Sequence, residues 1–184
     1  EGKSEEAKEM YLKCYEICQY LADETDSLVI RSDLAIICER LGIIYHSENN
    51  FSAAKEMYIK SFEINLAVLE ATGTIEAEYA LAISYDRLGF IYTDECRIED
   101  AEEMHMKALE LRKAIAEKTG TVEARKALSA SYETIGSNYE NKGELQKAKE
   151  LYLYARDIYQ EISDETKTTE SFSDLARANG NLGN

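Results

Sequence analysis

The 184-residue sequence contains no proline and no tryptophan, and it has few basic residues. Proline ends helices and is frequent in turns, so its absence favours a chain made almost entirely of helix with short connections. The 21 Lys and Arg residues face 36 Asp and Glu residues, which gives a net charge of −15. Such a chain lacks the clustered cations that nucleic-acid phosphates and anionic membrane surfaces attract, so we expect neither as a partner.

Long apolar runs and paired cysteines are also missing. No stretch approaches the roughly 18 apolar residues of a membrane-spanning helix, and no signal peptide is recognisable after Glu1. The four cysteines lack the paired spacing of a disulfide scaffold, which favours a reducing, cytoplasmic location. Apolar residues recur along the whole chain, so a folded core is expected.

An internal repeat of 47 residues organises the chain. The segment Ala7-Lys8-Glu9-Met10-Tyr11 returns with small changes at residues 54, 101 and 148. A second motif, Leu41-Gly42 followed by Tyr45, returns at residue 88 and, with isoleucine in place of leucine, at residue 135, and its Leu-Gly pair returns at residue 182. Two independent motifs with one period indicate about four copies of a single unit.

Each unit is predicted to be a pair of helices. Apolar residues recur with helical spacing over about 51–71 and again over about 75–93. Thr72-Gly73-Thr74 separates the two, and Thr119-Gly120-Thr121 does so one period later. Glycine suits the left-handed residue that ends a helix, and the threonine after it can cap the next helix. The polar turn between units has residues that tolerate positive φ at positions 2, 49 and 143, whereas Cys96 departs from that rule.

These motifs resemble the tetratricopeptide repeat. Tyr85-x-x-Leu88-Gly89-x-x-Tyr92, followed by Ala101, matches the family's pattern, and Tyr132 to Tyr139 followed by Ala148 matches it again. The period of 47 exceeds the usual length of about 34 residues, which implies helices about two turns longer, as in kinesin-light-chain-like repeats. The resemblance implies an all-α fold, a right-handed α-solenoid of antiparallel helix hairpins. Residues 1–184 are expected to form one such array of about four units, excised from a longer solenoid.

No constellation of residues predicts catalysis or metal binding. Cys14 and Cys18 lie one helical turn apart, with only Cys38 and His46 as further ligands. Cys14 shares its repeat position with Ser61, Ala108 and Ala155, so a buried small residue is the preferred interpretation. His105 replaces tyrosine at a repeat position and is predicted to lie in the core. We therefore expect no enzyme, no cofactor and no metal site.

The family's concave groove is the expected functional surface. In tetratricopeptide arrays the first helix of each hairpin lines this groove, where peptides or partner helices bind. Carrying the inward positions over by register predicts the groove residues Ile36, Glu39, Ile43, His46, Ile83, Asp86, Phe90, Thr93, Ala130, Glu133, Ser137 and Glu140. Glu39, Asp86 and Glu133 form an acidic column, while Ile43 and Phe90 are apolar at positions that need not be buried. A solvated face with incidental apolar residues is the alternative interpretation.

The sequence thus predicts a scaffold that binds a basic and partly apolar protein or peptide in its groove. One alternative is a sensor domain of a larger signalling protein that responds to a peptide ligand. Another is a purely architectural array. The apolar faces at the two ends further predict weak end-to-end self-association.

Overall fold

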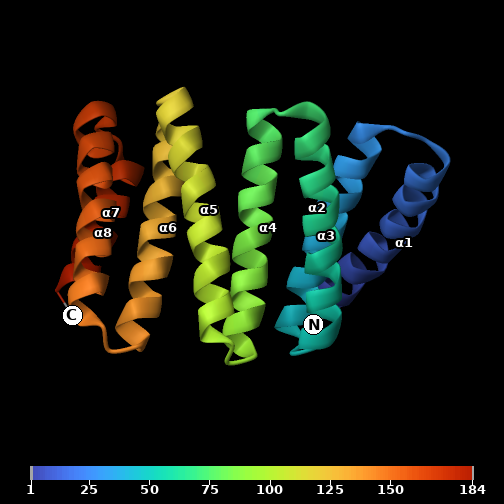
Figure 1. Cartoon of the computed structure of the whole chain (residues 1–184), viewed down its shortest axis with the longest axis horizontal. Helices are drawn as coiled ribbons and strands as arrows, with labels where there is room; N and C mark the ends of the chain where they lie inside the picture. Colours follow the sequence, from blue (N-terminus) through green and yellow to red (C-terminus); the bar gives the residue numbers. More distant parts are fainter. Residues whose placement is uncertain (1, 184) are drawn as a thin grey trace. The chain divides into compact units, whose positions relative to one another are not determined.

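Eight α-helices make up the computed structural model, which describes residues 2–183 and the side chains of residues 5–183 (Figure 1). The chain divides into two compact units, Glu1–Met104 and His105–Asn184, and the boundary lies within one helix. No strand occurs in the described residues, so the predicted all-α class is confirmed.

The helices repeat with the period of the sequence. Three helices that begin at residues 28, 75 and 122 have 20 residues each, and three that begin at residues 51, 98 and 145 have 22. Unit 1 contains the first four helices and the start of α5, and unit 2 contains the rest. The bounds are α1 (Gly2–Glu24), α2 (Leu28–Ser47), α3 (Phe51–Thr72), α4 (Ile75–Asp94), α5 (Ile98–Thr119), α6 (Val122–Asn141), α7 (Leu145–Thr166) and α8 (Thr169–Leu182).

The predicted turn chemistry is confirmed at most positions. Gly73 and Gly120 are left-handed, with φ of 59° and 61°, and the next threonine in each case caps the following helix. Thr74, for example, accepts a hydrogen bond from the backbone N–H of Ala77 at 3.3 Å. Asn49, Cys96 and Gly143 have φ of 59°, 59° and 77°, so Cys96 adopts the left-handed conformation despite its side chain. The prediction for position 2 is wrong, because Gly2 belongs to α1 and not to a turn.

Glycine permits close packing inside the helix hairpins. The Tyr58 ring of α3 lies over Gly42 of α2, where an added Cβ would be 2.4 Å from Tyr58 Cε1. In unit 2 the corresponding distance from Gly136 of α6 to Tyr152 Cε1 of α7 is 2.7 Å. Tyr58 packs in a cluster with Ala54, Leu88 and Ile91, which joins α3 to α4. The Leu-Gly motif therefore marks the contact between the two helices of a hairpin.

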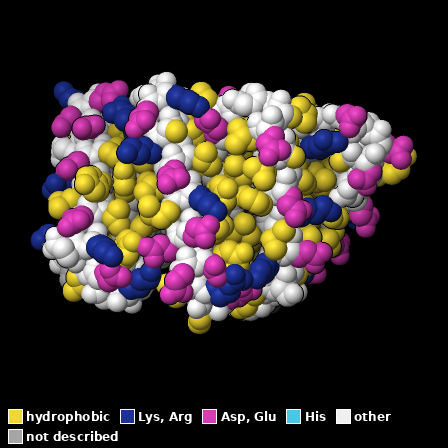
Figure 2. All heavy atoms as spheres, viewed as in Figure 1, with side chains coloured by type: hydrophobic (Ala, Val, Ile, Leu, Met, Phe, Trp, Pro, Cys, Tyr) yellow, Lys and Arg dark blue, Asp and Glu magenta, His cyan; other side chains and the backbone are white. Residues whose placement is uncertain are grey.

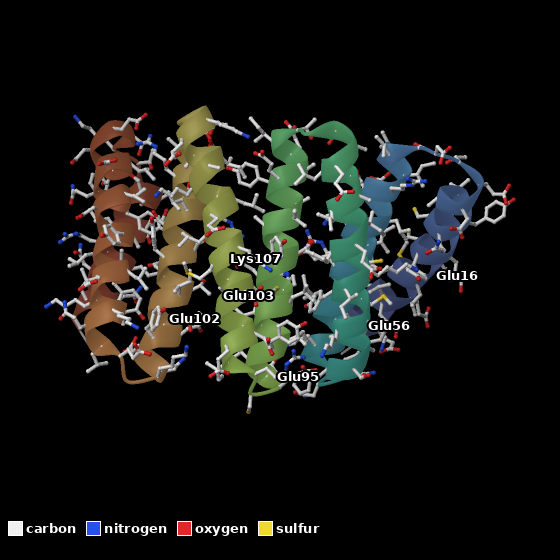
Figure 3. The ribbon with its side chains drawn as sticks, viewed as in Figure 1. Glu16, Glu56, Glu95, Glu102, Glu103 and Lys107 are labelled. Atoms are coloured by element: carbon white, nitrogen blue, oxygen red, sulfur yellow. The ribbon has the colours of Figure 1, made fainter. Side chains whose placement is uncertain are left out.

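In unit 1, a lysine near the start of a helix pairs with the glutamate that caps the end of the next helix. Lys8 Nζ donates to Glu48 Oε2 at 2.6 Å, and 47 residues later Lys55 Nζ donates to Glu95 at 2.8 Å (Glu95 is labelled in Figure 3). Each lysine also lies over a tyrosine ring, Tyr45 at 5.0 Å and Tyr92 at 5.2 Å. The exact repetition of this contact supports the 47-residue unit.

Candidate functional site

An apolar cleft opens between α2 and α4 of unit 1. It has a volume of about 510 Å³, and the C-terminal half of α3 forms its floor. Its walls carry Val29 and Ile36 from α2 and Ile83 from α4, with exposed fractions of 71%, 53% and 37%. Other aliphatic side chains are as exposed, for example Ile17 at 60% and Leu145 at 66%, but Val29, Ile36 and Ile83 line one cleft. On the face shown in Figure 2, apolar side chains gather in furrows between helices, with charged side chains beside them. The cleft is thus a place where apolar surface remains open to a ligand.

A buried polar contact fixes the floor of the cleft. Asn65 of α3 is 8% exposed, and its side-chain N–H group donates to Ser84 Oγ of α4 at 2.9 Å. Ser61, one turn before Asn65, donates to the backbone carbonyl of Ala35 in α2 at 2.9 Å. These hydrogen bonds connect α3 to both α2 and α4, so the helices that carry the aliphatic side chains of the cleft are held in place.

The acidic residue predicted in this wall is engaged in an ion pair. Glu39 Oε1 accepts hydrogen bonds from Arg87 Nε at 3.0 Å and from an Arg87 terminal nitrogen at 2.8 Å. The Glu39 side chain is only 17% exposed, so Arg87 neutralises most of its charge. Glu76, on the rim of the cleft, is exposed and has no ion-pair partner among the described residues. Negative charge is therefore presented at the mouth of the cleft and not on its wall.

The other predicted groove residues of unit 1 lie outside the cleft. Ile43 is half-buried and packs against the Tyr58 cluster, so the expectation that it need not be buried is wrong: it helps to fill the contact between hairpins. His46 Nε2 lies 2.6 Å from Asp94 Oδ2, and its ring meets Phe51 edge to face. Phe90 is 42% exposed. Thr93 donates to the backbone carbonyl of Gly89 at 3.0 Å, and Asp86 is half-buried.

Ion pairs occupy the equivalent surface of unit 2. Ala130 and Arg177 hold the repeat positions of Ile36 and Ile83. Arg177 pairs with Glu133, and this hydrogen bond is the main cause of a raised Arg177 pKa. Glu133 also accepts from Asn181 at 3.0 Å. Lys126 bridges Glu170 at 2.6 Å and Asp174 at 2.9 Å.

The remaining predicted residues of unit 2 flank this ion-pair network. Ala130, Ser137 and Glu140 are exposed. Glu140 accepts a hydrogen bond from the Tyr152 hydroxyl at 2.7 Å. Burial and then this bond raise the pKa of Tyr152 to about 12. Charged side chains thus cover unit 2 where unit 1 has its aliphatic cleft.

The cysteine and histidine predictions had different outcomes. His105 is 1% exposed, as predicted for a core residue. Cys14 is exposed, so its prediction as a buried residue is wrong, although Ser61, Ala108 and Ala155 at the same repeat position are buried. Ser61 packs against α2, the helix before its own, whereas no helix of the described residues packs on the corresponding side of α1. No group of three or more His, Cys, Asp or Glu side chains in the described residues could hold a metal ion.

Sequence reasoning missed several residues of the cleft. Leu28, Val29 and Val68 line it but were not predicted. Val29 lies seven residues before Ile36, so both project from one face of α2, and this spacing was the available signal. No helix within residues 2–183 has the length and apolar character required to cross a membrane.

Family comparison identifies the repeat. Two family models described as tetratricopeptide repeat match residues 35–67 and 81–118, each of which spans one hairpin of the structure. The chain is a tetratricopeptide-repeat protein. Among functionally curated proteins, no sequence matches it at a significant level. Repeats of this family serve as protein-interaction scaffolds, and this chain has the fold of one.

Solved structures share the fold. BtubC (BKLC) from P. vanneervenii is 24% identical with a TM-score of 0.66, and the match covers 88% of this chain and 59% of BtubC. This tetratricopeptide-repeat chain thus spans about three fifths of that relative. A Podosopora anserina putative kinesin light chain with nearly identical TPR-like repeats is 21% identical with a TM-score of 0.61, covering 99% of this chain and 80% of that one. The apo form of RapI is 15% identical with a TM-score of 0.57, covering 93% and 63%. These similarities confirm the α-solenoid fold.

Proposed function

We propose that this tetratricopeptide-repeat chain binds a protein or peptide segment in the α2–α4 cleft of unit 1. The observation that carries the proposal is the open aliphatic wall formed by Val29, Ile36 and Ile83 around a volume of about 510 Å³. Burying these side chains against a ligand gains about 25 cal/mol for each Å² of apolar surface removed from water. They gain nothing comparable within their own unit, because each remains substantially exposed.

The chemistry of the cleft favours a partner with an apolar anchor and a basic flank. The lining residues are mostly aliphatic, so the anchor is an aliphatic or aromatic side chain. Glu39 is already paired with Arg87, which leaves the wall nearly neutral. Glu76 stands exposed at the rim, and the whole chain carries a net charge of −15. Lys or Arg beside the anchor would therefore be attracted, and association would slow as salt is added.

The difference between the two units also supports this choice. At the positions of Ile36 and Ile83, unit 2 has Ala130 and Arg177, and Arg177 is engaged with Glu133. Folding of the repeat therefore does not require aliphatic side chains at these positions. In our proposal the exposed Phe90 of unit 1 extends the contact with the partner, and the cleft of the same unit supplies the anchor.

A peptide-display selection tests the proposal. The immobilised chain is used to select from a random peptide library, and affinities of the selected peptides are measured for the wild type and for Ile36→Lys and Ile83→Lys. The control is Ile59→Lys on α3, where the isoleucine is 36% exposed but does not line the cleft. We expect a consensus with an apolar anchor beside Lys or Arg, and at least tenfold weaker binding to both cleft variants.

Two results would contradict the proposal. One is a selection whose peptides bind Ile36→Lys and Ile83→Lys as tightly as they bind the wild type. The other is an equal loss of affinity in the Ile59→Lys control, which would mean that added positive charge, and not the loss of the cleft, changes binding. Circular dichroism confirms that each variant remains folded, as expected for substitutions of exposed side chains.

A further inference from the structure

We propose that the side-chain oxygen of Asn65, Oδ1, selects the anchor of the bound peptide by accepting a hydrogen bond from it. This inference rests on the proposed binding of a peptide in the α2–α4 cleft and specifies that peptide more closely. The anchor is tyrosine or tryptophan, whose rings are largely apolar and carry one O–H or N–H donor. Phenylalanine and leucine can also fill an apolar cleft, but they bring no donor.

The orientation of the Asn65 amide is fixed by its partners. Its nitrogen donates to Ser84 Oγ at 2.9 Å and to the Ala80 carbonyl at 3.4 Å, and it lies 3.5 Å from Ser61 Oγ. Both serine hydroxyls already donate their protons to backbone carbonyls, Ser84 to Ala80 at 3.1 Å and Ser61 to Ala35 at 2.9 Å. All three partners of the amide can therefore only accept, so they require its N–H₂ group, and the oxygen points away from them.

The Asn65 oxygen has unused acceptor capacity at the floor of the cleft. Among the described residues no group donates to Oδ1, although the side chain as a whole is 8% exposed. Oδ1 is nevertheless not one of the polar atoms that are sealed from solvent without a partner, and Asn65 lines the cleft. The oxygen is therefore open to the cleft, where a ligand can donate to it.

The apolar surroundings make this acceptor selective. A side chain that fills the cleft excludes water from Asn65 Oδ1, and a buried acceptor without a donor costs free energy. Tyrosine or tryptophan supplies a donor in place of the water, whereas phenylalanine leaves the oxygen unpaired. A site that hydrogen-bonds its ligand rejects the analogue without the donor more strongly than it rejects the loss of one methyl group.

Two other polar side chains of the cleft are less suited to this role. Glu39 accepts two hydrogen bonds from Arg87. The Ser32 hydroxyl donates to the Leu28 carbonyl at 2.9 Å and is more exposed than Asn65, so its oxygen is more easily hydrated when a ligand is bound. Asn65 is thus the acceptor that an anchor in the cleft covers most completely.

The fold does not require a spare acceptor at this repeat position. In α5 the position holds Arg112, which donates to Ser131 Oγ at 2.5 Å and has no acceptor atom in its side chain. In α7 it holds Tyr159, whose hydroxyl oxygen accepts from Arg177 at 3.0 Å. Of these three residues, Asn65 alone combines a contact to the following helix with an oxygen that no protein group uses.

Peptides that differ only at the anchor test the inference. A peptide obtained by display selection is synthesised with tyrosine or phenylalanine at its anchor, and with tryptophan or 1-methyltryptophan, which lacks the N–H donor. Fluorescence anisotropy measures the affinity of each for the wild type and for Asn65→Leu. For at least one pair we expect the wild type to bind the donor-bearing peptide about tenfold more tightly.

Asn65→Leu has nearly the same size as the wild-type side chain but no acceptor. It should bind both members of each pair with equal affinity and should bind the phenylalanine peptide at least as tightly as the wild type does. Circular dichroism checks its folding, and Asn65→Ala takes its place if it does not fold. The control is Ser32→Ala, which removes another cleft hydroxyl and should keep the preference for the donor.

Three results would overturn the inference. One is equal affinity of the wild type for both members of each pair, and another is a preference that persists in Asn65→Leu. The third is loss of the preference in Ser32→Ala, which would assign the acceptor to Ser32. None of these results affects the proposed function, because Ile36→Lys and Ile83→Lys test binding in the cleft separately.

Discussion

Gly42→Ala tests the glycine–tyrosine contact that joins the helices of a hairpin. The added Cβ would lie 2.4 Å from Tyr58 Cε1 and 2.6 Å from Cδ1, well inside van der Waals contact. The ring has little room to yield, because Tyr58 is 3% exposed and packs against Ala54, Leu88 and Ile91. Overpacking of this kind lowers the free energy of unfolding by about 1–3 kcal/mol.

The higher helix propensity of alanine opposes this loss. Replacing glycine inside a helix gains about 1 kcal/mol, so the net destabilisation by Gly42→Ala should be about 0–2 kcal/mol. Gly180→Ala in α8 is the matched control, because nothing lies within 4 Å of its added Cβ. It should raise the free energy of unfolding by up to about 1 kcal/mol, somewhat less than an interior position because α8 ends at Leu182.

Thermal melts followed by circular dichroism measure both variants. At about 2–4 °C for each kcal/mol in a chain of this size, Gly42→Ala should lower the Tm by a few degrees and Gly180→Ala should raise it. In a Tyr58→Leu background, which removes the ring, Gly42→Ala should become stabilising. An increase in Tm for Gly42→Ala alone, equal to that for Gly180→Ala, would refute the packing argument.

Three further predictions concern single side chains. The pKa of Tyr152 is raised to about 12, so the folded state holds the hydroxyl proton more tightly than the unfolded state does. The resulting contribution to the free energy of unfolding is present below about pH 10 and is lost between about pH 10 and pH 12. When urea unfolding is measured across that range, Tyr152→Phe should lose stability less steeply than the wild type. Cys96→Gly should raise the free energy of unfolding by about 1 kcal/mol, because Cys96 has φ of 59° and glycine adopts this conformation without strain; an unchanged Tm would contradict this. Glu39→Gln should lower the free energy of unfolding by up to about 1 kcal/mol, because the ion pair with Arg87 is lost. A double-mutant cycle with Arg87→Gln that gave no coupling energy would contradict a stabilising role for this ion pair.

The fold could be predicted because the features of the sequence recur at one spacing of 47 residues. The Leu-Gly motif and the Thr-Gly-Thr turns specify helix ends and close contacts that the structure contains within one or two residues. Repetition also permitted the prediction for His105, whose repeat position is otherwise tyrosine and which is fully buried. A single helix pair would not have provided this comparison.

The candidate site could be predicted only in part, because repeat register gives the direction of a side chain but not its neighbours. Ile36 and Ile83 line the cleft as expected from their inward positions. Glu39 has the same direction, yet the arginine that neutralises it lies 48 residues later, one position out of the 47-residue register. Ile43 is drawn into the contact between hairpins for a similar reason. Such contacts depend on how far a side chain reaches toward the next helix. Comparison of equivalent repeat positions does not reveal that reach.

Methyl NMR of isoleucine-labelled protein is the most direct test of the proposed binding site. A peptide obtained by display selection is titrated into the chain, and shifts of the isoleucine methyl signals are followed. Binding in the α2–α4 cleft predicts large shifts for Ile36 and Ile83, with small shifts for Ile59 on α3 and for Ile17 on α1, which is 60% exposed. Saturating binding that moves the signals of Ile59 or Ile17 and leaves those of Ile36 and Ile83 in place would contradict the account.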